Sequence, residues 1–332
     1  MSPPNDAADY TRSLSAASEA LHAIPRRAEV PLECAGMRLD RILAHLFPEY
    51  SRSRLQTWVR QARVTVDGRP SASSAKLWGG EHIRLTPELD AGDEARPEDI
   101  PLAVVYDDAA LIVLDKPPGL VMHPGSGNRA GTLMNALLHR APELARLPRA
   151  GIVHRLDKDT SGLLVVARTL TAQTSLVRQL QARTVRRTYL ALVVGLPEAA
   201  GTVEAPVGRH PRQRTKMAVV ASGKPARTHY RVLEHGAGWS LVECRLDTGR
   251  THQIRVHMAH IGHPLIGDPV YLPREAVRRL PAAAHRFHRQ ALHAAALALE
   301  HPVEGDVREW VAPMPRDMHD LLEALRHDAA SS

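Results

Sequence analysis

The sequence has few of the residues that mark secreted, membrane-spanning or thiolate metal-binding proteins. Only two of its 332 residues are cysteines, Cys34 and Cys244, and they lie far apart without a Cys-x-x-Cys pair. Neither a disulfide framework nor a cysteine metal site is therefore indicated. No apolar stretch of signal-peptide type lies near the start, and no later apolar run approaches membrane-spanning length. These absences predict a protein of the reducing cytoplasm.

Aromatic residues are also scarce, at 4% of the chain. This argues against nucleic-acid recognition through broad aromatic stacking platforms. What the sequence does contain is positive charge: 43 Lys+Arg against 36 Asp+Glu, a net charge of +7 and a pI near 9.8. Arginine supplies most of that excess, and its planar guanidinium suits recognition of phosphate. An RNA-binding protein fits this balance without being proved by it.

Two segments suggest other chemistry and do not support it. The glycines of Gly125–Gly131 fit neither GxGxxG before a helix nor GxxxxGK[ST], so a nucleotide-dependent hydrolase would lack its phosphate loop. His257, His260 and His263 are spaced by three, but Gly262 interrupts the helix and no acidic or cysteine ligand motif accompanies them. We expect no bound metal.

The length predicts a large domain and a small one. We interpret residues 1–28 as a disordered tail, 29–88 as a compact module, 89–100 as an acidic linker, 101–326 as the large domain and 327–332 as a second tail. The N-terminal tail is rich in Ser, Ala and Pro, and order is expected to begin near Val30. The linker holds five acids and one arginine, so it should neither pack nor bind RNA.

Hydrophobic spacing predicts the elements of the small module. Apolar residues at helical intervals indicate helices at 38–47 and 52–62, with Ser51 as the N-cap of the second. Alternation indicates strands at 64–66 and 82–85, and Asp67-Gly68 marks a tight turn.

The large domain mixes strand-like runs with helices that do not alternate one per strand. Strands are expected at 104–106, 111–114, 163–167, 189–194, 228–233, 241–246 and 297–299, and helices at 132–139, 171–183, 252–261 and 317–326. This pattern favours an α+β fold with a mixed, mainly antiparallel sheet flanked by helices over a doubly wound nucleotide fold.

The most informative stretch is HRLDKDTSG, His154 to Gly162. It places Asp157 two residues after Arg155 and directly before the apolar run Leu163–Ala167, so a strand would hold this carboxylate on a rigid element. Taken alone, Arg-x-Asp is more often a solvated ion-pair turn. The nine residues together favour a functional carboxylate.

This stretch resembles the catalytic motif of the RluA family of pseudouridine synthases. DKPPGLVMHPG (115–125) and TLMNALLH (132–139) precede it in the family's order, and RTYLALVVG, GRTHQIRVHMAHIGHPLIGDPVY, RQALHA and APMPRDM follow it. Residues 38–68 resemble the S4 RNA-binding module, although many such modules have Gly where this chain has Ala62. The resemblance implies the pseudouridine synthase fold with an S4-like α/β domain before it.

The resemblance also implies the roles of the site residues. Asp157 would be the nucleophile, Arg255 its charged partner, Tyr189 the tyrosine that stacks on the base, and Arg155 the residue that fills the gap left by a flipped-out uridine. From the residues alone, Arg255 could equally be an exposed arginine off the apolar stripe of its helix, and Tyr189 a buried strand tyrosine. Whether the carboxylate attacks C1′ or C6, or a glycal forms, stays open.

RNA contacts are expected at two basic groups. The first is a hairpin between strands with Arg209, Arg212, Arg214 and Lys216, and the second is the helical face with Arg52, Arg54 and Arg60. Solvated charge is the alternative for both.

The resemblance implies that specific uridines of 23S rRNA are isomerised, with the helix 69 stem-loop as the expected substrate. The partner would be the large ribosomal subunit, and the protein would be a monomer that needs no cofactor, metal or membrane. A non-catalytic ribosome-assembly protein is the competing interpretation. Such a protein could have lost Asp157, Arg255 or Tyr189, and this chain has all three.

Overall fold

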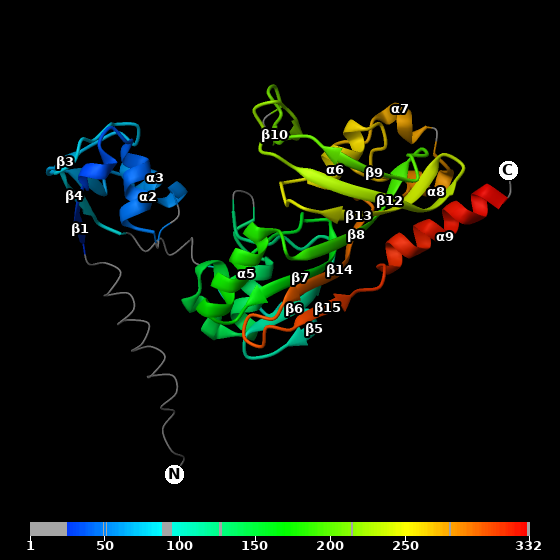
Figure 1. Ribbon diagram of the computed structural model, residues 1–332, viewed down its shortest axis with the longest axis horizontal. Coiled ribbons are helices and arrows are strands. Elements are labelled where there is room, and N and C mark those ends of the chain that lie inside the picture. The colour runs from blue at the N-terminus through cyan, green and yellow to red at the C-terminus, as the bar shows by residue number, and fades with distance from the viewer. Residues whose placement is uncertain are drawn as a thin grey trace, which may run out of the picture. The chain divides into compact units, whose positions relative to one another are not determined.

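The computed structural model describes residues 25–330 except 49, 51, 88–94, 126–127, 214 and 279. The chain divides into two compact units, Met1–Glu94 and Ala95–Ser332, which are coloured by residue number in Figure 1. Most of the expected N-terminal tail and the expected N-cap Ser51 lie outside the described residues. Within the described part of the chain, no helix has both the length and the apolar character needed to span a bilayer.

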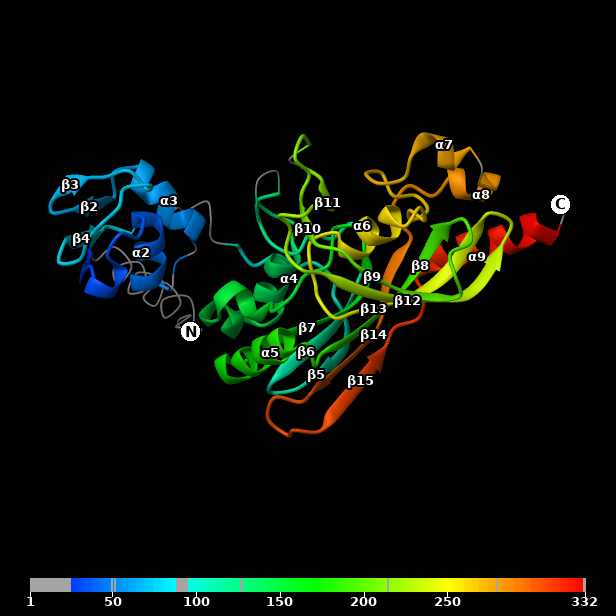
Figure 2. The ribbon, with the colours of Figure 1, turned by 45° about the horizontal axis from the view of Figure 1, so that its top comes forward.

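The N-terminal unit packs two helices on one face of a four-stranded antiparallel sheet (Figures 1 and 2). The sheet order is β1-β4-β2-β3. Its elements are β1 (Arg26–Glu29), the 3-10 turn η1 (Leu32–Cys34), α2 (Leu39–Leu46), α3 (Arg52–Arg60), β2 (Val64–Val66), β3 (Arg69–Pro70) and β4 (His82–Leu85). Leu39 and Leu55 of the helices share one core with Ile83 of β4, and each is at most 1% exposed. The two predicted helices and the strands at 64–66 and 82–85 are confirmed.

Order begins earlier than the sequence predicted. β1 begins at Arg26, inside the expected tail of residues 1–28, and pairs antiparallel with β4, with Arg27 opposite Arg84. The prediction that order starts near Val30 is therefore wrong. β1 has no hydrophobic run to reveal it, because it is an edge strand stabilised largely by main-chain hydrogen bonds to β4.

The end of the expected acidic linker also packs, contrary to the prediction. Ala95 contacts the core of the second unit. The buried Asn135 side chain donates to the Arg96 carbonyl at 2.7 Å, and the Glu98 carboxylate accepts from the Gly131 amide at 3.1 Å. Residues 95–100 therefore belong to the larger unit, where the Glu98 side chain accepts from a backbone amide while Asp99 stays exposed. Residues 89–94 lie outside the described part.

The larger unit is built on a nine-stranded mixed sheet. Its order is β5-β6-β7-β14-β8-β13-β12-β9, with β15 also on β14, and β7–β14 is the parallel pair among the described strands. The strands are β5 (Ala103–Asp107), β6 (Leu111–Lys116), β7 (Ser161–Ala167), β8 (Arg186–Val194), β9 (Ala200–Glu204), β12 (Arg227–Gly236), β13 (Trp239–Leu246), β14 (Leu292–Glu300) and β15 (Val307–Val311). A separate hairpin consists of β10 (Val207–Arg209) and β11 (Met217–Val219). The predicted mixed, mainly antiparallel sheet is confirmed.

Helices cover both faces of this sheet. They are α4 (Leu133–Arg140), α5 (Leu170–Ala182), α6 (Gln253–His260), α7 (Arg274–Val277), α8 (Ala282–His285) and α9 (Arg316–Ala330), with 3-10 turns η2 (Pro142–Arg146) and η3 (Pro148–Gly151). The helix α9, red in Figure 1, runs four residues past the predicted end at 326. The prediction of a C-terminal tail from 327 is therefore wrong through Ala330.

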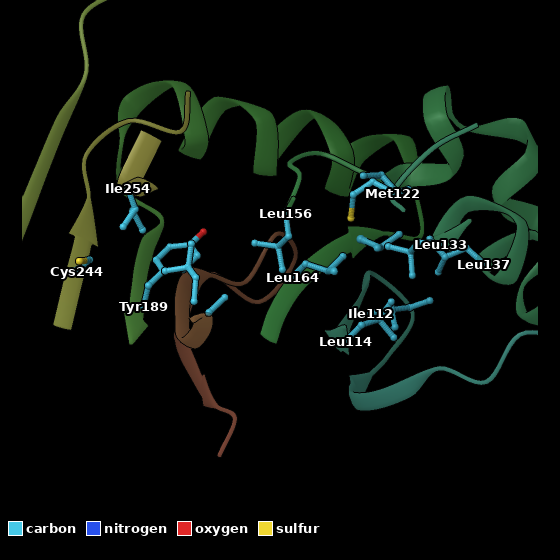
Figure 3. Close-up of a cluster of buried hydrophobic side chains, with 14 of the residues drawn as sticks. Ile112, Leu114, Met122, Leu133, Leu137, Leu156, Leu164, Tyr189, Cys244 and Ile254 are labelled. Atoms are coloured by element: carbon cyan, nitrogen blue, oxygen red, sulfur yellow. The ribbon is translucent and has the colours of Figure 1, made fainter. Parts of the chain in front are cut away.

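Central strands are buried on both sides, which explains their unbroken apolar sequences. Ile112 and Leu164 face the cluster that includes Leu133 and Leu137 of α4 (Figure 3). Their neighbours Leu111 and Leu163 face the opposite cluster, with Leu176 of α5. A strand buried on both faces loses the apolar–polar alternation of a surface strand. The site described next begins at the N-terminal end of β7, one of these rigid strands.

Candidate active site

Asp157 lies in a short turn that is held at both ends. The Thr160 amide donates to the Asp157 carbonyl at 3.1 Å, and His154 Nε2 accepts from the Val165 amide of β7 at 3.0 Å. Gly162 follows at φ +110°, and a Cβ there would lie 2.3 Å from the Ala294 carbonyl oxygen of β14. Only glycine fits this close parallel pairing. The turn is thus fixed by the sheet, and the Asp157 side chain stays 16% exposed.

Arg255 connects two carboxylates from different segments. Its Nη1 donates to Asp157 Oδ2 at 3.0 Å, while Nε and Nη2 donate to the two oxygens of Asp268 at 2.7 and 2.9 Å. Asp268 Oδ1 also accepts from the amides of Val270 and Tyr271. The bidentate pair with Asp268 orients the guanidinium, which leaves one nitrogen aimed at Asp157. Asp157 Oδ2 is thus engaged by Arg255, whereas among the described residues Oδ1 accepts no hydrogen bond.

Arg255 is not an exposed helical arginine. It lies on α6, and its side chain is 4% exposed. Burial disfavours its charge, but the hydrogen bonds and attraction of Asp268 and Asp157 outweigh burial and raise the pKa of Arg255. The guanidinium therefore keeps its charge in the interior.

Two further side chains complete this group. His252, at φ +57° before α6, places Nε2 3.8 Å from Asp157 Oδ1, and its Nδ1 lies 2.9 Å from the Tyr271 hydroxyl. That hydroxyl accepts from the Met217 amide of β11, so its own hydrogen can be donated to His252 Nδ1. We assign the Nε2–H tautomer on this basis. Burial lowers the pKa of His252, although Asp157 opposes this, so the ring is neutral at neutral pH.

Tyr189 lies on β8, between Cys244 of β13 and Ala294 of β14. It is 6% exposed, and its ring lies in the cluster with Leu156 and Ile254, as Figure 3 shows. Burial raises the pKa of its phenol, and the charge of Asp157 adds to that effect while Arg187 opposes it. The hydroxyl is thus protonated at neutral pH.

Arg155 is exposed, beside the carboxylate turn. Near it, burial followed by the charges of Arg149 and Arg155 lowers the pKa of His123 to about 4. The exposure of Arg155 agrees with a residue that contacts RNA, and equally with a solvated side chain.

The basic hairpin β10–β11 has mixed roles. Arg209 and Arg212 are exposed, and Arg214 lies outside the described residues. Lys216 instead donates to the Val270 carbonyl at 3.2 Å, next to Asp268. With the Met217–Tyr271 hydrogen bond, this contact anchors the base of the hairpin to the active-site loop.

Arg52 of the N-terminal unit also has a structural contact that the sequence did not predict. It donates at 2.7 Å to Asp40, whose side chain is 1% exposed and also accepts from Arg38 and Gln56. Burial alone would raise the pKa of Asp40, but these hydrogen bonds lower it well below its usual range. Arg54 lies over the Trp58 ring at 5.8 Å, and Arg60 donates to Thr57. Arg52 is thus half exposed and holds a buried carboxylate at the same time.

The histidines considered as metal ligands do not converge. His257 contacts Thr228 and the Ala205 carbonyl, while His263 contacts the Val194 carbonyl. Another group, His301 with Glu304 and Asp306, lies within ligand distance. There, however, His301 Nε2 contacts Asp108, and Nδ1 accepts from the Glu304 amide. Both ring nitrogens are therefore engaged by the protein itself.

Sequence reasoning missed Asp268, His252 and Tyr271. All three lie within the segment 249–271, where the motif points to Arg255 alone. The available signal was the Gly-Asp-Pro turn that places Asp268 after α6, since an aspartate before such a turn commonly accepts from backbone amides.

Comparisons with known proteins agree with this architecture. The model of the RNA pseudouridylate synthase family matches residues 110–260, and that of the S4 domain matches residues 37–77. Ribosomal large subunit pseudouridine synthase D of Nitrosomonas europaea is 56% identical over 304 residues, which cover 91% of this chain and 88% of that protein. The protein of the same name from Escherichia coli K12 is 51% identical over 299 residues, covering 88% and 92%.

Solved structures show the same fold. Human RNA pseudouridylate synthase domain containing 4 has a TM-score of 0.53 at 27% identity, covering 68% of this chain and 93% of that one. Human RNA pseudouridylate synthase domain containing 1 has a TM-score of 0.52 at 29% identity, covering 69% and 96%. The mixed sheet with its carboxylate turn, and the small S4 unit before it, define an RNA-modifying enzyme with an attached RNA-binding domain. The chain belongs to the RNA pseudouridylate synthase family and is an isomerase.

Proposed function

We propose that this protein converts specific uridines of 23S rRNA to pseudouridine, with the helix 69 stem-loop as its substrate and Asp157 as its nucleophile. The substrate is supported by relatives named for the large ribosomal subunit, which match about nine-tenths of the chain. The nucleophile is supported by one observation above all. Asp157 is a partly exposed carboxylate with one oxygen held by a buried arginine and the other 3.8 Å from His252 Nε2.

The reaction rearranges bonds without gain or loss of atoms. The N1–C1′ bond of uridine breaks, a C5–C1′ bond forms, and the proton of C5 leaves while N1 gains one. A base inside a helix is unreachable, so the uridine must first be flipped out, and the exposed Arg155 would occupy the gap.

The surrounding residues have distinct roles in this proposal. Arg255 orients the Asp157 carboxylate through a hydrogen bond, and Asp268 is a positioning residue that acts through Arg255. Tyr189 offers a buried ring for the base and a protonated hydroxyl. The Nε2–H of His252 points to the same side as Asp157 Oδ1, where it can donate to an oxygen of the bound uridine. Since these residues hold and move protons by themselves, the proposal includes no cofactor or metal.

The proposal extends to the setting of the enzyme. The large-subunit rRNA is the partner, through the S4 unit and the exposed arginines of the β10–β11 hairpin. We propose that the protein acts as a monomer in the cytoplasm. A ribosome-assembly protein without catalysis is the alternative, and no observation favours it over the enzyme.

The decisive experiment is to map pseudouridine in 23S rRNA after incubation with the wild-type protein or with Asp157→Asn. We expect Asp157→Asn to abolish product while RNA affinity stays within a few-fold, because phosphate contacts carry affinity and the carboxylate carries chemistry. Asp159→Asn, two residues away in the same turn, is the matched control and should retain activity. Turnover by Asp157→Asn above a few per cent of wild type would remove Asp157 from this role.

A further inference from the structure

The sheet of the N-terminal unit carries a groove on the face away from its helices. The groove has a volume of about 750 Å³ and is lined by β1, β4, β2 and the residues that flank them. Ile83 and Leu85 of β4 point into the core beneath α2 and α3. Since side chains alternate along a strand, Arg84 between them points to the opposite face, toward the groove.

Register brings arginines together on this face. Arg27 of β1 and Thr65 of β2 both pair with Arg84 of β4, so the three side chains form one row across three strands. Arg63, just before β2, also lines the groove. Like charges directly opposite each other across a sheet are destabilising. Arg27 and Arg84 are both exposed, and within the described part of the chain neither has a carboxylate partner.

The charge is unevenly distributed along the groove. Glu29 pairs with His82 at one end, whereas Arg27, Arg84 and Arg63 gather toward the other. Small-molecule pockets are mostly apolar, and the side chains on this face are mostly polar or charged. A row of arginines on an exposed sheet is better suited to the phosphates of a nucleic-acid backbone, which guanidinium binds in a bidentate manner.

We propose that this groove, defined by Arg27, Arg63, Thr65 and Arg84, is a second RNA-backbone site of the S4 unit, separate from its helical face. The proposal rests on the proposed function, since it assigns the groove to rRNA. The ligand is the phosphate backbone, and no base is read. Thr65, next to Arg84 on the side away from Arg27, can donate its hydroxyl to a phosphate bound by Arg84.

The test uses the full-length protein and an in vitro transcript of 23S rRNA. The double variant Arg27→Gln/Arg84→Gln loses two phosphate contacts. A plot of the logarithm of the RNA association constant against the logarithm of the salt concentration should therefore be less steep than that of wild type, by about 1.8. Between 50 and 200 mM salt, wild-type affinity should therefore drop about 12-fold more than that of the variant. Arg27→Lys/Arg84→Lys keeps both charges and should keep a slope near that of wild type.

The matched control is Arg178→Gln/Arg316→Gln, which removes the same charge from exposed helical positions of the larger unit. We expect its slope to stay at the wild-type value. Thermal melting should show that Arg27→Gln/Arg84→Gln is at least as stable as wild type, because a pair of like charges has been removed. If the salt dependence of Arg27→Gln/Arg84→Gln is as steep as that of the control Arg178→Gln/Arg316→Gln, the groove does not bind RNA.

Pseudouridine mapping on the same transcript separates the two proposals. If the salt dependence of Arg27→Gln/Arg84→Gln is less steep than that of wild type, and wild type itself forms no pseudouridine in the transcript, the groove is supported and the proposed substrate is rejected. Normal product formation with an unchanged slope would support the substrate and reject the groove.

Discussion

The side chain of Arg255 fixes the orientation of the Asp157 carboxylate. Its guanidinium is oriented by Asp268 through two hydrogen bonds and reaches Asp157 with the third nitrogen. The Asp157 carboxylate is therefore held in one orientation by a side chain that is itself fixed by a second carboxylate.

The positioning role of Asp268 can be tested with Asp268→Asn. The amide keeps the shape but loses the charge that orients Arg255, so we expect kcat to fall about 100-fold, equivalent to about 2.7 kcal/mol. The Kd for RNA should change less than three-fold, because Asp268 is buried and does not face RNA. Combining Asp268→Asn with Arg255→Lys should cost little more than Arg255→Lys alone, since both act through one contact. Additive losses would mean that Asp268 acts independently of Arg255.

The hydroxyl of Tyr189 is tested by Tyr189→Phe, which keeps the buried ring. If the phenol takes part in proton transfer, kcat should fall about 100-fold or more, within the range of general acid–base catalysis, at unchanged RNA affinity. Tyr230→Phe, on β12, which is separated from β8 by β13, is the control and should retain activity. A fall of less than a few-fold in Tyr189→Phe would show that the ring acts through contact alone.

At the residue scale, local sequence singled out Asp157 as the candidate nucleophile but did not reveal the residues around it. The carboxylate stands in a continuous motif beside its strand, whereas Arg255 comes from a helix 98 positions later. A helical pattern alone could not decide whether Arg255 was exposed. Its burial depends on Asp268, and no periodicity in the sequence connects a helix to a following loop.

Among the elements, those with a strong apolar pattern were predictable and those formed by pairing were not. β6 and β7 have unbroken apolar runs because both of their faces are buried. β1 carries two arginines, and β9, Ala-Gly-Thr-Val-Glu, has no apolar run, so their strand character comes from the neighbours β4 and β12. Such strands have no signal of their own, because the partner supplies the hydrogen bonds.

The turn after α3 has Ala62 where many S4 modules have glycine, and this difference should change the free energy of unfolding. Ala62 has φ +57°, where a Cβ costs about 1–2 kcal/mol. Ala62→Gly should relieve that strain, and after the extra entropy of glycine in the unfolded chain we expect a net gain of about 0.5 kcal/mol. Urea unfolding of the full-length protein, followed through the tryptophans, measures the change.

Gly68 provides the opposite control for this prediction. It has φ +79°, and a Cβ there would meet nothing within 4 Å. Gly68→Ala should therefore destabilise the unit by about 0.5 kcal/mol, the backbone cost less the lower entropy of alanine in the unfolded chain. A loss of stability in Ala62→Gly would show that the turn is not strained.

At the scale of the whole molecule, the two units have separate cores. The hydrophobic cluster of the S4 unit comprises residues 30–85, and the other clusters lie beyond residue 94. Composition predicted this division, because an acid-rich stretch separates two patterned regions. It could not place the boundary, since Ala95, Arg96 and Glu98 pack through contacts that only the fold brings together.

This separation predicts that a fragment beginning at Ala95 folds and modifies RNA by itself. It keeps the site from Asp157 to Tyr271 but loses the S4 unit, so we expect kcat near that of the full chain and a KM at least ten-fold higher, because phosphate contacts carry affinity. A fragment beginning at Pro101 is the matched comparison. It leaves the buried Asn135 amide without the Arg96 carbonyl, which should cost about 1–3 kcal/mol of stability. Circular dichroism melts and steady-state kinetics on the helix 69 stem-loop measure both effects. Equal KM values for the full chain and the Ala95 fragment would show that the S4 unit does not contribute to substrate binding.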